Sequence, residues 1–168
     1  MTHTPGALPV LCALSASLLT GCAGAQTPER GTAPPESVQA VQALCDDLAE
    51  ALAAGNGVSA EALFVPDSGF AELARHMHEE PPPAEAVTQL REERARRFQQ
   101  VARALNEAPG AEFLPPDPSS WTWTDRAPWL IRGVALPVRM EGVERRIVLD
   151  QAVQVDGRWY IFQGPVLR

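Results

Sequence analysis

Residues 129–162, WLIRGVALPVRMEGVERRIVLDQAVQVDGRWYIF, are rich in β-branched and aromatic residues and carry the clearest signals of secondary structure in the chain. Glu141-Gly142 and Asp156-Gly157 interrupt this stretch, and an Asp-Gly pair between apolar runs is a strong signal for a two-residue hairpin turn. Glu-Gly carries the same signal more weakly. The stretch therefore predicts three consecutive antiparallel strands, around 129–140, 143–155 and 158–162.

The two predicted turns also fix the register, because side chains alternate between the faces of a strand. One face then carries the cross-strand pairs Met140–Val143, Val138–Arg145, Leu136–Ile147, Val134–Leu149, Arg132–Gln151, Leu130–Val153, Val155–Arg158, Val153–Tyr160 and Gln151–Phe162. This face is largely apolar, so we expect helices to cover it. Pro137 predicts an edge strand or a bulge, and a bulge would move part of this set to the other face.

Upstream of the strands, apolar residues recur at helical spacing. A helix over 38–54 would bury Val41, Leu44, Cys45, Leu48 and Leu52, and Gly55 would end it. A short turn, a helix beginning near Asp67 and a long helix over 84–106 follow. Helices at about 38–106 and strands at about 120–163 predict one α+β domain, residues 38–168, with N-terminal helices packed on a curved, cone-like antiparallel sheet.

The N-terminus has the pattern of an export signal. Residues 1–21 hold no charged side chain, and the apolar run over 7–19 is too short to span a bilayer. Leu19-Thr20-Gly21-Cys22 follows and resembles the bacterial lipobox. The resemblance implies a signal peptide over 1–21, cleavage before Cys22, and lipid on its thiol. The absence of Lys and Arg before residue 7 departs from the usual signal-peptide pattern.

A lipidated Cys22 would anchor the protein stably to a membrane of the cell envelope, since two or three acyl chains suffice. Ala23 directly after the cysteine does not match the signal for inner-membrane retention, so the outer membrane is the expected location. Residues 22–37, rich in Gly, Ala, Thr and Pro, are expected to be a flexible tether. The net charge of -7 argues against nucleic acid as a partner. Cys45 would be the one cysteine left for the domain's interior, without an intramolecular disulfide partner.

The order of helices and then a sheet ending in Val155-Asp156-Gly157-Arg158-Trp159-Tyr160-Ile161 resembles the nuclear-transport-factor-like, or ketosteroid-isomerase-like (SnoaL-like), α+β cone superfamily. The resemblance implies that the helices and the concave sheet enclose either a pocket or a plain core. Members include isomerases, dehydratases and binding modules, so the resemblance does not decide the function.

Arg132, Gln151 and Tyr160 are the candidate pocket residues. Arg132 and Gln151 form a polar pair in the middle of the apolar face, where a gap between helices would hold a ligand. The alternative is that the pair contacts helix-end carbonyls or water, as buried polar groups usually do.

Trp129, Ile131, Trp159 and Ile161 are the candidate interface residues. The predicted register puts them on the second face of the sheet, where exposed aromatic side chains would form a partner or homodimer surface. The alternative is that the Trp121-Thr122-Trp123 segment or the long helix covers this face.

The chain shows no motif for a catalytic triad, a phosphate loop, a metal or a cofactor. Isomerase-type members of the superfamily pair a carboxylate with a tyrosine, and Tyr160 is the single tyrosine here. Its partner could be Asp46, Asp47 or Asp67. We therefore expect a non-catalytic, lipid-anchored envelope protein that binds a partner protein or a small apolar ligand. The alternatives are an isomerase- or hydrolase-type enzyme and a structural subunit of an envelope assembly.

Overall fold

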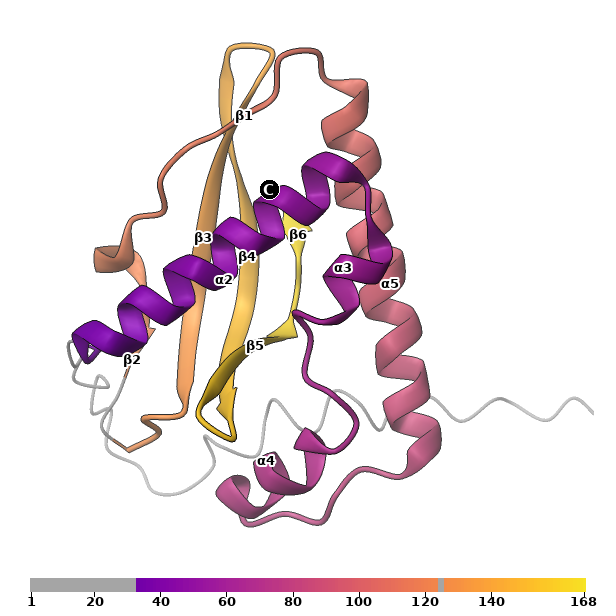
Figure 1. The fold of residues 1–168 in the computed structure, drawn as a ribbon, viewed down its shortest axis with the longest axis vertical. Helices are drawn as coiled ribbons and strands as arrows, with labels where there is room; N and C mark the ends of the chain where they lie inside the picture. The colour runs from indigo at the N-terminus through magenta and orange to yellow at the C-terminus, as the bar shows by residue number, and fades with distance from the viewer. Residues whose placement is uncertain (1–32, 124–125) are drawn as a thin grey trace, which may run out of the picture.

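The structure of this protein is a computed structural model, which describes residues 33–123 and 126–168. The expected signal peptide, the lipid site at Cys22 and most of the expected tether lie outside the described residues. The described chain is α+β, with helices packed on a curved antiparallel sheet (Figure 1), as the sequence predicts.

The helices follow the predicted order. They are α2 (Pro35–Ala54), α3 (Gly57–Glu61), α4 (Gly69–Met77) and α5 (Ala84–Glu107), with a 3-10 turn, η2, at Pro118–Ser120. Helix α2 begins three residues before the expected start, because proline is well tolerated in a first helical turn. It ends at Gly55, whose φ of 61° is the left-handed conformation common after a helix.

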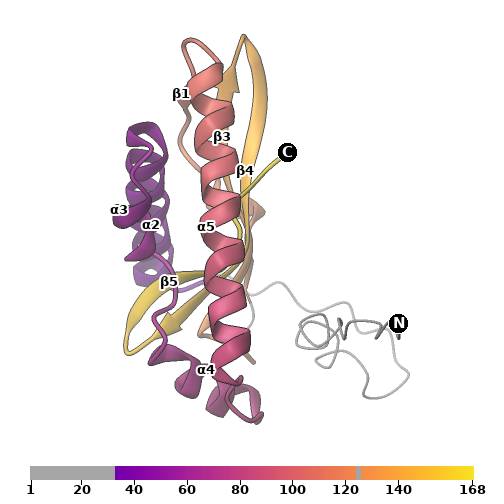
Figure 2. The same ribbon diagram turned by 90° about the vertical axis from the view of Figure 1, so that its right-hand side faces the viewer.

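Six strands form the sheet, in the order β1-β3-β4-β5, with β2 also paired to β3 and β6 to β4. They are β1 (Glu112–Phe113), β2 (Thr122–Trp123), β3 (Leu130–Met140), β4 (Val143–Val155), β5 (Arg158–Gln163) and β6 (Val166–Leu167). The short β1 and β6 were not predicted. Helix α2 crosses the sheet, α5 runs beside it along the long strands, and Figure 2 shows α2 and α3 together on one side.

The predicted register is confirmed for every pair but one. All four turn residues, Glu141 and Gly142 in the first turn and Asp156 and Gly157 in the second, have positive φ. This conformation matches the twist of the paired strands in a two-residue hairpin. The exception is Gln151, which pairs with Gln163 and not with Phe162. A bulge between Gln151 and Ala152 moves the partner strand by one residue.

The prediction of one continuous helix-covered face is wrong. Val134 and Leu149 pack in the main apolar cluster, but so do Ile131 and Ala152, which regular alternation would place on the opposite face. The ladder is interrupted at Gly133, whose φ is 68°. The faces therefore change roles at Gly133 and not at Pro137, because a glycine tolerates the left-handed backbone there.

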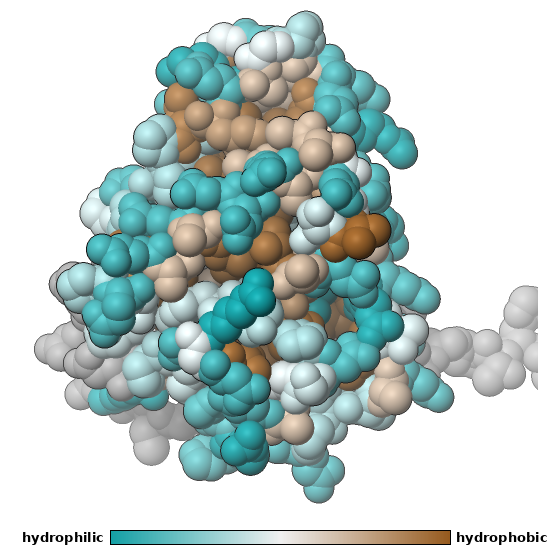
Figure 3. Space-filling model, in the orientation of Figure 1, coloured by the Kyte–Doolittle hydropathy of each residue, from teal (hydrophilic) through white to brown (hydrophobic). Residues whose placement is uncertain are grey.

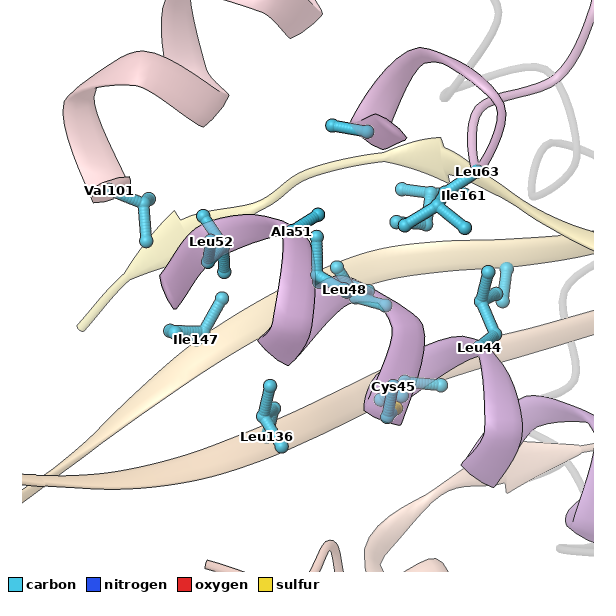
Figure 4. Packing of buried hydrophobic residues seen from close by; sticks show 14 of the residues in the cluster. Leu44, Cys45, Leu48, Ala51, Leu52, Leu63, Val101, Leu136, Ile147 and Ile161 are labelled. Carbon is cyan, nitrogen blue, oxygen red and sulfur yellow. The ribbon is translucent and has the colours of Figure 1, made fainter. Parts of the chain in front are cut away.

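The main cluster lies between α2 and the sheet. Leu48 and Leu52 of α2 lie over the long hairpin, where Leu136 and Ile147 are found (Figure 4). The described residues also form a second cluster around α4. The described domain thus buries an extensive core of its own, which is the condition for an independently folding unit.

The second cluster lies on the opposite face, at the end of the sheet where α4 packs (Figure 1). Phe70 and Leu73 of α4 contact the other side of the hairpin there, through side chains that include Leu130 and Val153. Leu130 directly precedes Ile131, and Val153 directly follows Ala152, and both Ile131 and Ala152 belong to the main cluster on the other face. At this end, therefore, both faces of the sheet are covered.

The predicted interface does not form. Ile131 and Ile161 are 0% exposed and Trp159 is 4% exposed, all within the main cluster, while Trp129 is half-buried against the second cluster. Trp121 and Trp123 are buried in the main cluster as well, and Trp123 pairs with Ile131. The Trp-Thr-Trp segment extends the sheet at this edge and adds its tryptophans to the cluster, whereas the element that lies over this face is α2 (Figure 4).

Candidate functional site

A pocket of about 850 Å³ opens between α3, the α3–α4 connection, α5 and the start of β5. Figure 3 shows it as a hollow with an apolar floor below α3. Its apolar lining includes Val58, Phe64, Val87 and Phe98. Charged side chains from the same elements also reach it, so the pocket has both an apolar and an ionic part.

Arg94 of α5 is the central charged residue of this pocket, and only 5% of it is exposed. Its Nη1 donates to the carbonyl of Val65 at 3.3 Å and its Nη2 to that of Phe162 at 3.0 Å. The guanidinium lies 5.5 Å from the ring centres of Phe64 and Phe70, and 5.7 Å from that of Phe162. Three aromatic rings and two carbonyls thus fix its position.

Arg94 remains a cation in this environment. Burial lowers the pKa of its guanidinium to about 10, and the nearby Arg91 adds to that lowering while Asp67 opposes it. A pKa of about 10 still leaves the group protonated at pH 7. Its buried Nε has no hydrogen-bond partner, and no carboxylate of the described chain forms an ion pair with it.

Three of the other four charged groups of the pocket, Arg91, Asp67 and Arg158, have partners in the structure. Arg91 of α5 forms an ion pair with Asp67 of the α3–α4 connection, and this hydrogen bond raises the pKa of Arg91. The guanidinium of Arg158 lies 5.2 Å from the ring centre of Tyr160. The Arg91–Asp67 pair joins the two walls of the pocket and balances its own charges.

The structure separates the three predicted pocket residues. Tyr160 lines the large pocket, whereas Arg132 and Gln151 line a different cavity of about 20 Å³ beside Met77 and Trp129. That volume is close to what one water molecule needs, and the Nε of Arg132 is buried there without a protein partner. The expectation of one cavity lined by all three residues is wrong, and the small cavity fits the alternative of a polar pair that contacts water.

The candidate carboxylates are also separated. Asp46 and Asp47 are exposed on α2 and do not line the pocket, while Asp67 lines it together with Tyr160. Of the carboxylate–tyrosine pairs considered from the sequence, Asp67 with Tyr160 is the one that shares a cavity. The carboxylate of Asp67 is already bonded to Arg91.

Sequence reasoning missed Arg94, although its pattern contains a signal. Arg94 stands four residues after Leu90 and four before Phe98, on the apolar stripe of α5. A charged residue at such a position is either a break in the stripe or a buried functional group. The charges around it, among them Glu93 and Arg97, form ion pairs on the helix surface and conceal this position.

His76 has a structural role in the described chain. Its ring stacks on Trp129 at 5.3 Å between centres, and its Nε2 lies 3.5 Å from Glu72. Glu72 in turn accepts a hydrogen bond from the backbone N–H of Asp156 at 3.2 Å. These contacts tie α4 to the β4–β5 turn. No helix among the described residues is long and apolar enough to cross a bilayer.

The pocket beside α3 and α5 is therefore the site of greatest chemical interest in the described chain. Comparison with protein-family models, curated proteins and solved structures gives no significant match for this chain.

Proposed function

We propose that this protein is a lipid-anchored protein of the cell envelope whose α+β domain binds a small ligand, without catalysis, in the pocket lined by Phe98, Arg94 and Tyr160. The pocket carries this proposal. Its volume of about 850 Å³ falls within the range of small-molecule sites, and its lining combines apolar side chains with a few converging polar groups.

The anchor rests on the lipobox and is tested separately. Cells given radiolabelled palmitate should label the full-length protein, and Cys22→Ala should abolish the label because the thiol is the lipid acceptor. Cys45→Ala is the matched control and should keep the label. Label on Cys22→Ala would contradict the anchor, and fractionation of the labelled protein would test the outer-membrane location.

The binding proposal can be tested on residues 33–168 with 1-octanol as an apolar probe, followed by ¹H–¹⁵N NMR. We expect amide shifts centred on Phe98 and Tyr160. Ala95→Trp, on the pocket wall, should remove them by filling the space, whereas Ala43→Trp on exposed α2 should not. Shifts that persist in Ala95→Trp, or that spread over the surface, would contradict a pocket site.

An isomerase- or hydrolase-type enzyme is the second candidate, favoured by one observation: Tyr160 and Asp67 line the same pocket. Turnover of 4-nitrophenyl octanoate that is lost in Tyr160→Phe would support it. The ion pair of Asp67 with Arg91 argues for the binding function, since a paired carboxylate is a weaker proton acceptor. A structural subunit would instead reveal itself as a stable complex when the lipidated protein is purified from membranes.

A further inference from the structure

We propose that the ligand is an amphipathic carboxylate, with a single negative charge held by Arg94 and an apolar body packed along Phe98. The inference rests on the proposed binding function and names the chemical class that this pocket selects. Three features of the pocket support it.

The first feature is the unbalanced charge of Arg94. A buried cation is normally paired with a carboxylate, because burial removes the water that stabilises the charge. Arg94 is 5% exposed and has carbonyls and aromatic rings around it, but no ion pair within the described chain. A ligand carboxylate would supply the missing counter-charge.

The second feature is that the guanidinium is already fixed and still has donors to offer. Two of its five N–H groups are used on the carbonyls of Val65 and Phe162, and its Nε has no partner. Three surrounding rings prevent it from turning away. A fixed guanidinium loses little entropy on binding, which favours a planar carboxylate.

The third feature is the charge balance of the whole pocket. Three arginines line it, Arg91, Arg94 and Arg158, against the two carboxylates of Glu61 and Asp67. An excess of one positive charge remains in a chain whose net charge is -7. One excess cation matches a monoanion better than a phosphate, whose charge at pH 7 is close to two.

The apolar lining then selects the rest of the ligand. Val58, Val87 and Phe98 provide no hydrogen-bond partners, so the part of the ligand against them is expected to be hydrocarbon. A medium-chain fatty acid and an arylalkanoic acid share this chemistry. Octanoate and 3-phenylpropionate represent the two sources.

The test compares head groups on the same hydrocarbon chain. Residues 33–168 are titrated at pH 7 with octanoate, 1-octanol and octylamine, and the shifts of the pocket amides give each dissociation constant. We expect octanoate to bind about tenfold more tightly than 1-octanol, as a charge-assisted hydrogen bond provides, and octylamine to bind most weakly. Titration with 3-phenylpropionate shows whether the pocket prefers an aliphatic or an aromatic body.

Variants of Arg94 connect this preference to one side chain. Arg94→Met should abolish the preference for octanoate while 1-octanol still binds, and Arg94→Lys should restore part of it. Arg103→Met, an exposed arginine on the same helix, is the matched control and should behave as the wild type. If Arg94→Met fails to fold, the comparison of octanoate with 1-octanol in the wild-type domain decides by itself.

The outcomes separate the two proposals. Equal binding of octanoate and 1-octanol in the pocket would overturn the anionic ligand and leave the binding function intact. Tighter binding of octylamine would overturn it as well. Binding of none of the probes would count against both proposals.

Discussion

The cluster under α2 and the pocket region beside α5 are built from the same sheet but differ in chemistry. The first packs apolar side chains of the helix, the hairpin and the Trp121–Trp123 segment in a closed core, and it shares Phe64 with the surroundings of Arg94. The second surrounds a buried arginine with aromatic rings and lies beside a cavity of about 850 Å³. One side of the domain is therefore closely packed, whereas the other keeps an open space and a buried charge, both of which lower stability.

The largest test of this comparison is a cavity in the closed core. Leu48→Ala should lower the free energy of unfolding by about 2–5 kcal/mol, because Leu48 is fully buried and its neighbours cannot fill the space. Urea denaturation measures the loss. Glu50→Ala on the exposed side of α2 is the control and should change stability by about 0.5 kcal/mol or less. A small loss in Leu48→Ala would mean that this core is not the stabilising side.

Cys45 allows the closed core to be tested by pH. Burial, and to a smaller extent Asp46, raises the pKa of its thiol from 9.0 to about 12. The unfolded thiol ionises near pH 9.0, so the stability gained by keeping it neutral is complete below that pH and is lost as the pH rises toward 12.

Relative to Cys45→Ala, we expect the wild type to lose about 1.4 kcal/mol per pH unit above pH 9, measured by urea denaturation at a series of pH values. The native thiol should also resist Ellman's reagent until the domain unfolds. Parallel pH curves for the two proteins would show that water reaches Cys45.

Gly133 lies where the faces of the sheet change roles, between the closed core and the second cluster around α4. Its φ of 68° should make Gly133→Ala destabilising by about 1 kcal/mol, through the backbone alone, because no atom lies near the added Cβ. Gly133→Asn should cost less, although asparagine is larger, because asparagine tolerates the left-handed region. Thermal denaturation ranks the variants, and a larger loss for asparagine would indicate crowding as the cause.

The smallest effect is expected at Glu72, which ties α4 to the β4–β5 turn. The hydrogen bond from the backbone N–H of Asp156, and then that with His76, lower the pKa of its carboxyl below the usual 4.5. A lowered pKa stabilises the fold above pH 4.5, and this contribution is lost as the pH falls through the folded value.

Glu72→Gln should therefore have a slightly lower melting temperature than the wild type at pH 7, and the gap should close at acidic pH. Glu79→Gln, an exposed neighbour after α4, should show no such gap. A gap that is independent of pH would assign the effect to shape and not to charge.

The parts of the fold that local physics determines were predictable from the sequence. The dipeptides Glu141-Gly142 and Asp156-Gly157 set the hairpins and all but one of the predicted pairs, because a two-residue turn fixes its register. The apolar stripe of α2 and the stop at Gly55 were equally local. The bulge beside Gln151 changed one predicted pair, from Gln151–Phe162 to Gln151–Gln163. The residues around the bulge do not differ in type from those of a regular strand, so the sequence did not predict it.

The candidate site was less predictable. Tyr160 lines a pocket, but with residues of α3, α5 and the connection after α3 in place of Arg132 and Gln151, and spacing along the chain does not reveal which segments converge. Arg132 and Gln151 were paired correctly but line another cavity, because Leu73 and Met77 of α4 enclose a separate space with them.

The α+β class and the hairpin register followed from the sequence, because turn residues and periodicity act within a few positions, and the lipobox predicts an exported, lipid-anchored chain on the same local basis. The tertiary structure alone decided that Arg94 is buried, that Trp159 belongs to the core, and that a pocket remains beside α5. A charged side chain is buried only when three or more segments, distant in the sequence, pack around it. These segments come together only in the folded chain.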